Sequence, residues 1–291
     1  MIRKVETQEE AFRLADMCWQ INQDPRFATR PLGDSVEEVR EYFGINVHPD
    51  DELLVCEEDG ELKGIFCLFV DEPHQYLQSQ GGFYALVDEY EDVFDEFMDY
   101  LTEKFEGWQL NIGMPEENHR LGEYMMEIGA SCIENTIIMV LEKQAYVRCD
   151  HPDVDMLKQE DWMEFIEMHH ALNPDMFWQG DMIISRDDLF QVFVVKREGH
   201  LAGALVMMIC EFSSEIFCCE VKDEYIMEGY QKQLMDAAAQ CCFEDCHQEE
   251  LASFVDVVAR EELKACRECG FAQVGTHIGY RLVLHKHDFG A

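Results

Sequence analysis

The first half of the chain alternates between apolar positions at helical spacing and apolar positions at strand spacing. Phe12, Ala15 and Trp19 recur every three to four residues, which predicts a helix over 9–23. The same spacing around Val39 predicts a second, short helix. The pattern that follows predicts strands at 53–57 and 62–70, an extended segment at 76–86, a helix at 93–105, a strand at 108–112, a helix from Pro115 and a strand at 131–141.

The second half repeats this order of elements. Its pattern predicts helices at 159–172 and near Ser185, strands at 190–195, 201–210 and 215–222, a helix at 227–243, a strand at 251–257, a helix at 261–269 and a strand at 272–284. Each half therefore has the order α-α-β-β-β-α-β-α-β. This order favours a mixed α/β sheet with helices on both faces.

Matching local sequences support an internal repeat. In each half an Asn-to-Phe segment follows the first helix, a glycine-containing turn separates two strands, and the last helix ends at a glycine. These pairs are 22–27 with 173–177, 58–64 with 197–203, and Gly129-Ala130 with Gly270-Phe271. We infer two copies of one unit of about 145 residues, which places the domains at 1–145 and 146–291.

The net charge of the chain excludes some classes of binding partner. Lys and Arg together number 22 against 61 Asp and Glu, which gives a formal net charge of −39. Such a chain repels polyanions, so we expect no nucleic acid partner. The 47 % hydrophobic fraction predicts a folded protein.

The longest apolar stretch, 202–210, is too short to cross a bilayer, so we expect no membrane partner and a cytoplasmic location.

The cysteines invite a metal interpretation that the spacing does not favour. The 13 cysteines include adjacent pairs, which indicates reduced thiols. Cys266 and Cys269 form one Cys-x-x-Cys pair near Cys241, Cys242, Cys246 and His247, but a single pair is a weak zinc signal and the others have helical spacing typical of buried thiols. His169 and His170 are adjacent, so they lie on different faces of their helix. We therefore predict no metal site.

The repeated element order, the glycine turn and the last helix ending in Gly-Phe resemble the GNAT superfamily of N-acetyltransferases. The resemblance spans nearly the whole chain as a tandem pair, with its specific part in the turn and last helix of each half. It implies two GNAT-like domains, each with a mixed, mainly antiparallel sheet and helices on both faces. It also implies acetyl-CoA as co-substrate.

The coenzyme loop of that family has the form (Arg/Gln)-x-x-Gly-x-(Gly/Ala), whose backbone N–H groups bind pyrophosphate at a helix start. The corresponding segment 226–231 keeps Gly229 but has Ile226 first, Gln231 last and an added Glu228. The segment 86–93 of the first half has no glycine and four carboxylates, which predicts that this half lacks a coenzyme site. The coenzyme-binding candidates are Val221, Lys222, Met227, Glu228, Gly229, Tyr230, Gln231 and Lys232.

Catalytic candidates follow from the same resemblance. A carboxylate on the strands beside the coenzyme would deprotonate the acceptor amine, and Glu211, Glu215 and Glu220 stand there. Cys266 occupies the position where the family often has a proton-donating Tyr, although packing is an alternative role for a thiol. The aromatic residues within 176–178, and Phe27 in the first half, either line an acceptor pocket or belong to the core.

These observations leave three functions open. The first is transfer of an acetyl group from acetyl-CoA to a small cationic amine, by direct attack without a covalent enzyme intermediate. The second is a non-catalytic binding module for a cationic ligand or a basic protein, favoured by the altered loop and the charge of −39. The third is a thiol redox or zinc protein. Convergence of Lys222 and Lys232 on an anion site would favour acetyl transfer. The sequence leaves the oligomeric state open.

Overall fold

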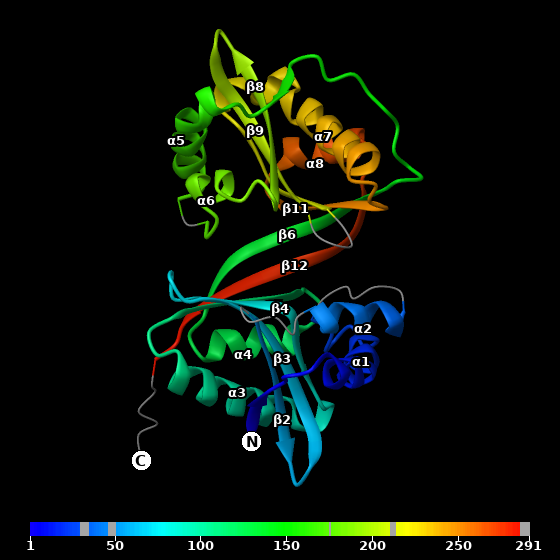
Figure 1. Cartoon of the computed structure of the whole chain (residues 1–291), viewed down its shortest axis with the longest axis vertical. Helices are drawn as coiled ribbons and strands as arrows, with labels where there is room; N and C mark the ends of the chain where they lie inside the picture. The colour runs from blue at the N-terminus through cyan, green and yellow to red at the C-terminus, as the bar shows by residue number, and fades with distance from the viewer. Residues whose placement is uncertain (30–34, 46–50, 175, 210–213, 286–291) are drawn as a thin grey trace. The chain divides into compact units, whose positions relative to one another are not determined.

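The computed structural model describes residues 1–29, 35–45, 51–174, 176–209 and 214–285. The chain folds into two compact units (Figure 1). Unit 1 comprises Met1–Asn135 together with Thr276–Ala291, and unit 2 comprises Thr136–Gly275.

Unit 1 is built around one mixed sheet. Its strands have the order β1-β2-β3-β4-β5-β12, and all neighbouring strands are antiparallel except β4 and β5, which are parallel. The elements are β1 (Ile2–Lys4), α1 (Gln8–Asn22), α2 (Val36–Ile45), β2 (Asp51–Glu58), β3 (Glu61–Asp71), β4 (Tyr76–Ala85), the 3-10 turn η1 (Val87–Glu89), α3 (Tyr90–Lys104), β5 (Gln109–Pro115), α4 (His119–Glu127), the start of β6 (Ser131–Glu142) and most of β12 (Ala272–Val283).

Unit 2 repeats this plan. Its strands have the order β6-β11-β10-β9-β8-β7, with β10 and β11 parallel and the other neighbours antiparallel. The elements after β6 are β7 (Val154–Met156), η2 (Gln159–Asp161), α5 (Trp162–Leu172), α6 (Gly180–Ile184), β8 (Phe190–Arg197), β9 (His200–Ile209), β10 (Ser214–Val221), η3 (Asp223–Glu228), α7 (Tyr230–Gln240), the π-helical turn η4 (Cys241–Asp245), β11 (Glu250–Asp256) and α8 (Arg260–Glu268).

Helices cover both faces of each sheet, as the order of elements predicts. In unit 1 the rings of Phe83, Phe94 and Tyr90 pack edge to face beneath α3, with centroids 4.7 and 5.1 Å from Phe83. A second cluster lies beneath α1 and α2. In unit 2 one cluster joins the sheet to α7 and α8, and another joins it to α5 and α6. The predicted mixed, mainly antiparallel α/β fold is confirmed.

The predicted boundary between residues 145 and 146 needs one correction. The last strand was expected in the second domain, but its residues from Thr276 onward belong to unit 1. In that part of β12, His277–Val283 pairs with Pro115–Gln109 of β5. Residues Thr136–Glu142 of β6 pair with β11 in unit 2. An apolar alternation fixes which face of a strand is buried, and it carries no information on which sheet the strand joins.

The predicted helix at 227–243 also differs in detail. Residues 223–228 form the 3-10 turn η3, and α7 begins only after Gly229. Gly229 has φ of +78°, a left-handed conformation that glycine adopts without steric cost. This residue therefore separates the turn from the helix.

A β-bulge in β10 decides which side chains face which helices. Ile216 is opposite Met207 of β9, but Cys218 is opposite Val206, so Phe217 is the extra residue. Ile216 packs in the cluster beneath α7 and α8, whereas Cys218 packs against the cluster beneath α5 and α6. Without the bulge, these two residues would share one face because side chains alternate along a strand. The bulge thus turns the even-numbered residues at the end of β10 toward α5.

Gly203 provides a test of this strand pairing. A Cβ atom at Gly203 would lie 2.6 Å from the carbonyl oxygen of Glu220 and 2.9 Å from a methyl carbon of Val221. We expect Gly203→Ala to lower the free energy of unfolding by about 1–3 kcal/mol, because the end of β10 has to move away. Denaturant unfolding measures this change. Gly275→Ala is the control, since its Cβ would have only an ordinary contact of 3.7 Å; an equal loss in both variants would contradict the prediction.

Candidate functional site

The two parallel strands of unit 2 part before they end. β10 pairs with β11 from Ser214 to Ile216. Beyond this point, within the described residues, β10 pairs with β9 alone as far as Val221, and β11 pairs with β6 alone as far as Asp256. The sheet therefore opens between the ends of these strands, and α7 follows the end of β10 in the chain.

The start of α7 has the properties of an anion-binding helix end. Gly229 is its N-cap, no described side chain caps it, and its first turn contains no acidic residue. The first backbone N–H groups of a helix lack intrahelical acceptors, and the helix dipole adds partial positive charge there. Backbone donors at Tyr230, Gln231 and Lys232 therefore suit a phosphate group.

The other coenzyme candidates lie around this helix start. Val221 is buried at the end of β10, and Tyr230 is buried against Tyr225 with ring centroids 6.4 Å apart. Met227 and Glu228 are exposed on η3. The structure thus places the candidates from Val221 to Lys232 along one continuous segment, and the Glu228 carboxylate opposes an anion beside it.

The two lysines do not converge on an anion site. Lys222 Nζ lies 3.8 Å from Glu164 Oε1 on α5. Lys232 Nζ lies 2.6 Å from Asp236 Oδ2 one turn along α7. Because each ammonium already has a carboxylate neighbour, the backbone amides are the stronger candidates for binding an anion.

Glu220 is held by a buried polar network. Glu220 is 6 % exposed, and its Oε1 atom lies 2.5 Å from His169 Nδ1. Asn173 Nδ2 donates a second hydrogen bond to the same oxygen. Glu220 Oε2 is buried and accepts no hydrogen bond from the part of the chain that the structure describes. The network joins α5 to the end of β10.

The protonation of His169 follows from its two partners. His169 Nε2 lies 2.9 Å from the carbonyl oxygen of Trp178, which only accepts, so Nε2 carries a hydrogen. Without a proton between them, His169 Nδ1 and Glu220 Oε1 would face each other with lone pairs, which repel. A further proton therefore lies between these two atoms. Burial lowers the pKa of His169, but the hydrogen bond and charge of Glu220 outweigh it and raise the pKa above its usual value. His170 is exposed and contacts Gln179, so the two histidines lie on different faces, as predicted.

Glu262 is a site residue that the sequence does not single out. It lies in the first turn of α8, and its carboxyl group interacts electrostatically with Asp256 at the end of β11 and with Glu220 at the end of β10. Burial, reinforced by these two acids, raises the pKa of Glu262 to about 8. A carboxyl group with this pKa can accept and donate a proton near neutral pH. Among 61 acids, no spacing signal distinguishes it.

The remaining catalytic candidates lie elsewhere. Glu215 is half-buried where β10 and β11 are still paired, and Glu211 lies outside the described residues. Cys266 is fully buried, with its Sγ atom 3.7 Å from Met235 Sδ, and burial raises the pKa of this thiol to about 12. This environment favours the packing role of Cys266 over proton donation.

Trp178 packs against the core beneath α5 and α6. The Trp178 ring lies 5.2 Å from Phe177 and 5.3 Å from Phe190, and Phe190 lies 5.9 Å from Phe217. The Trp178 carbonyl also fixes His169. Phe27 in unit 1 is buried against Tyr90. These contacts favour the core interpretation for Trp178 and for Phe27.

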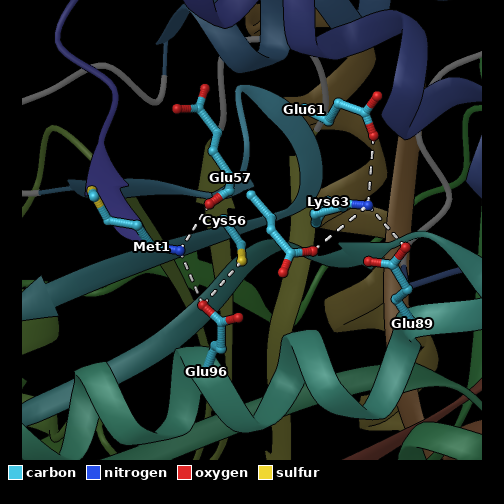
Figure 2. A network of polar contacts seen from close by, with 8 residues as sticks. Met1, Cys56, Glu57, Glu61, Lys63, Glu89 and Glu96 are labelled. Atoms are coloured by element: carbon cyan, nitrogen blue, oxygen red, sulfur yellow. Dashed lines mark hydrogen bonds and ion pairs between the residues drawn. The ribbon is translucent and has the colours of Figure 1, made fainter.

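In unit 1 the corresponding helix start carries carboxylates in its first turn. β4 and β5 also part, after Gln78 and Asn111, but the first turn of α3 carries Glu91 and Asp92. Lys63 Nζ lies 2.9 Å from Glu89 Oε1, and Arg120 Nε lies 2.8 Å from Glu91 Oε1. Figure 2 shows Lys63 among its acidic neighbours, together with the nearby Met1 amine and Glu96. These ion pairs favour the prediction that the first half lacks a coenzyme site.

Solved structures of similar fold identify the architecture. A GCN5-related N-acetyltransferase from Sphaerobacter thermophilus matches 98 % of this chain and 96 % of its own, with a TM-score of 0.65 and 14 % identity. A tandem GNAT protein from the clavulanic acid biosynthesis pathway, solved without acetyl-CoA, matches 99 % of both chains with a TM-score of 0.59 and 11 % identity. The chain has a tandem GNAT fold. A putative acetyltransferase from Pyrococcus horikoshii covers 97 % of this chain and 89 % of its own, with a TM-score of 0.59 and 13 % identity.

The tandem GNAT fold confirms the predicted resemblance in architecture. No family model and no curated protein matches the sequence. The identities of 11–14 % establish the fold alone, and a fold hosts different functions, so the activity has to be argued from the site. Among the described helices, none combines the length and the apolar character needed to cross a membrane.

Proposed function

We propose that this tandem GNAT protein transfers an acetyl group from acetyl-CoA to a small cationic amine, using unit 2. The observation that carries the proposal is the parting of β10 from β11 beside the uncapped start of α7. Backbone amides from Gly229 to Lys232 would bind the pyrophosphate of the coenzyme. The opening between the strands would hold the thioester beside Glu262.

Glu262 is the residue we assign to proton transfer, in place of Glu220. Glu220 Oε1 already accepts hydrogen bonds from His169 and Asn173, whereas Glu262 interacts with acids at the ends of both strands and has a pKa of about 8. The Glu262 carboxylate accepts a proton from the ammonium group, which frees the nitrogen lone pair for attack on the thioester, and Glu262 then releases this proton to water. As the C–N bond forms and the C–S bond breaks, the nitrogen loses a second proton, which passes to the departing thiolate, so no covalent enzyme intermediate is needed.

The charge around the site supports a cationic acceptor. Glu262 interacts electrostatically with Asp256 and Glu220, which lie at the ends of the two strands, and the whole chain carries −39. A negative field concentrates amines and steers them toward the site. The same field weakens binding of the polyanionic coenzyme, so we expect the affinity for acetyl-CoA to increase with moderate salt.

The alternative function is a binding module for a cationic ligand or a basic protein. The observation that favours it is the pairing of Lys222 and Lys232 with acids, which leaves the coenzyme phosphates without a lysine partner. Under this alternative, amines bind in unit 2 and acetyl-CoA does not.

Coenzyme binding is tested by Gly229→Asp. The new side chain would add a negative charge at the helix start and strain a residue at φ of +78°. In calorimetric titration at moderate salt, we expect micromolar binding of acetyl-CoA by the native chain and at least a hundredfold loss in the variant.

Gly199→Asp is the matched control for this titration. Gly199 has a similar φ of +87° and lies in the turn between β8 and β9, outside the candidate segment 221–232. Gly199→Asp adds the same charge and similar strain as Gly229→Asp. Because it does so outside the candidate coenzyme segment, we expect nearly native affinity for acetyl-CoA. Equal affinity in native chain and Gly229→Asp would contradict the site, and the absence of binding in the native chain up to millimolar concentration would favour the cation-binding alternative.

A further inference from the structure

Three potential metal ligands meet where α5 contacts β10. The nitrogen of His169, the Sγ atom of Cys218 and a carboxylate oxygen of Glu220 all lie within 4.8 Å of one another. His169 is fully buried and Glu220 is 6 % exposed. Cys218 and Glu220 lie on the same face of β10 because side chains alternate along a strand, and the bulge turns this face toward α5.

We propose that His169, Cys218 and Glu220 form a binding site for a single zinc ion that joins α5 to β10. The proposal goes beyond acetyl transfer and does not depend on it. It also revises the expectation of no metal site, because the partners of His169 come from a strand distant in sequence, not from its own helix.

The orientation of His169 presents the correct nitrogen to this site. Its Nε2–H group donates to the Trp178 carbonyl, 2.9 Å away, so Nδ1 is the nitrogen that faces Glu220. Histidine ligands of zinc commonly donate their other ring N–H to a carbonyl or carboxylate, which fixes the tautomer and the ring. This outer contact is therefore already in place.

Glu220 supplies a second free ligand atom. Oε2 is buried and accepts no hydrogen bond from any residue within the described ranges. A buried carboxylate oxygen without a partner loses its hydration without compensation. A cation bound by Oε2 would provide the missing interaction, while Asn173 keeps its hydrogen bond to Oε1.

The charges of the ligand set match a divalent ion. One thiolate and one carboxylate neutralise two positive charges, and the neutral imidazole adds none, so the buried site would carry no net charge. Thiolate and imidazole favour zinc over magnesium and calcium, which prefer oxygen ligands. Zinc replaces the proton shared by His169 and Glu220 and the proton of the Cys218 thiol, so binding releases two protons.

Cobalt substitution gives the sharpest test because a thiolate ligand produces a charge-transfer absorption. We expect the reduced full-length protein, stripped of metal, to bind one equivalent of Co²⁺ with this absorption, and Zn²⁺ to displace it. Cys218→Ala should abolish the absorption, and His169→Gln or Glu220→Gln should weaken zinc affinity at least tenfold.

Cys219→Ala is the matched control. Cys219 is the next residue on β10, but it packs against the cluster beneath α7 and α8, on the opposite face from Cys218. We expect this variant to retain the cobalt absorption. Retention in Cys218→Ala, or loss in Cys219→Ala with circular dichroism unchanged, would overturn the assignment.

X-ray absorption of the zinc-loaded native protein tests the site without any substitution. One sulfur and two or three nitrogen or oxygen neighbours are expected at the distances of tetrahedral zinc. Two or more sulfur neighbours would place the metal at another thiol cluster, such as Cys241 and Cys246, whose Sγ atoms are 4.0 Å apart. That result, or no stoichiometric binding, would refute the site even if the variants fail to fold.

Discussion

Glu262→Gln is expected to lower the rate of acetyl transfer by roughly a hundredfold or more while making the protein more stable at alkaline pH. The amide has nearly the shape of the carboxyl group but neither accepts nor donates the transferred proton. Measured with acetyl-CoA and a panel of small amines, the loss should appear in kcat. Glu261→Gln, its more exposed neighbour in the same turn, provides the control and should keep native activity.

The pH dependence of this variant gives a second readout. Glu262 has a pKa of about 8 in the free protein, so the native kcat/KM should rise with pH to a midpoint near that value. The rising limb should vanish in Glu262→Gln. If Glu262→Gln kept the same rise with pH as the native protein, the proton transfer would belong to another group.

The stability effect has the opposite sign. The folded-state pKa of Glu262 lies above its value of 4.5 in an unfolded chain, so the folded protein holds this proton more tightly. Between roughly pH 4.5 and 8 the free energy of unfolding falls by up to about 1.4 kcal/mol per pH unit from this group. Glu262→Gln removes that decline. Denaturant unfolding of both proteins at pH 5 and pH 8 measures how much the free energy of unfolding changes between these pH values. If Glu262 were instead stabilised in its ionised form, the native protein would gain stability with pH relative to the variant.

Ending the chain at Gly275 is expected to unfold unit 1. The missing segment supplies the ladder from His277 to Val283 beside β5, and it carries Tyr280 and Leu284, which are 6 % and 1 % exposed in the core. Loss of each large buried side chain costs about 2–5 kcal/mol. Together with the lost strand, this approaches or exceeds the whole stability of a typical domain, about 5–15 kcal/mol.

Hydrogen exchange distinguishes local from general loss in the truncated chain. Amides of β5 and α3 should lose protection, whereas those of β9 and β10 in unit 2 should keep it. A chain ending at His285 is the control, because it retains the paired strand. Native protection of β5 in the shorter chain would show that unit 1 does not need β12.

The elements were predictable because their signals are local. Helical spacing at Phe94, Phe97 and Leu101 indicates the buried face of α3, and the continuous apolar runs of β8 and β9 indicate strands buried on both faces. The glycine turns fix the hairpins, as at Gly60 and Gly199, both with positive φ. The sequence therefore predicted the layers of each unit and the resemblance to the GNAT fold.

The site was less predictable because its residues meet through tertiary packing. His169 and Glu220 are 51 positions apart, and their contact depends on a bulge at Phe217 that no local pattern indicates. The raised pKa of Glu262 arises from burial and from acids on two strands. The candidate segment around Gly229 was predicted from the preceding strand and from its glycine, whereas the ion pairs of Lys222 and Lys232 required the folded structure.

The three-residue strands at one edge of each sheet have a consequence for self-association. β1 and β7 each cover one sheet edge but offer few unpaired backbone groups for the addition of a further strand. A long, flat edge is a template for sheet-to-sheet aggregation, and a short one in a chain of charge −39 is a poor template. This protein is thereby protected against fibril growth at two edges, without the cost of covering them with additional helices.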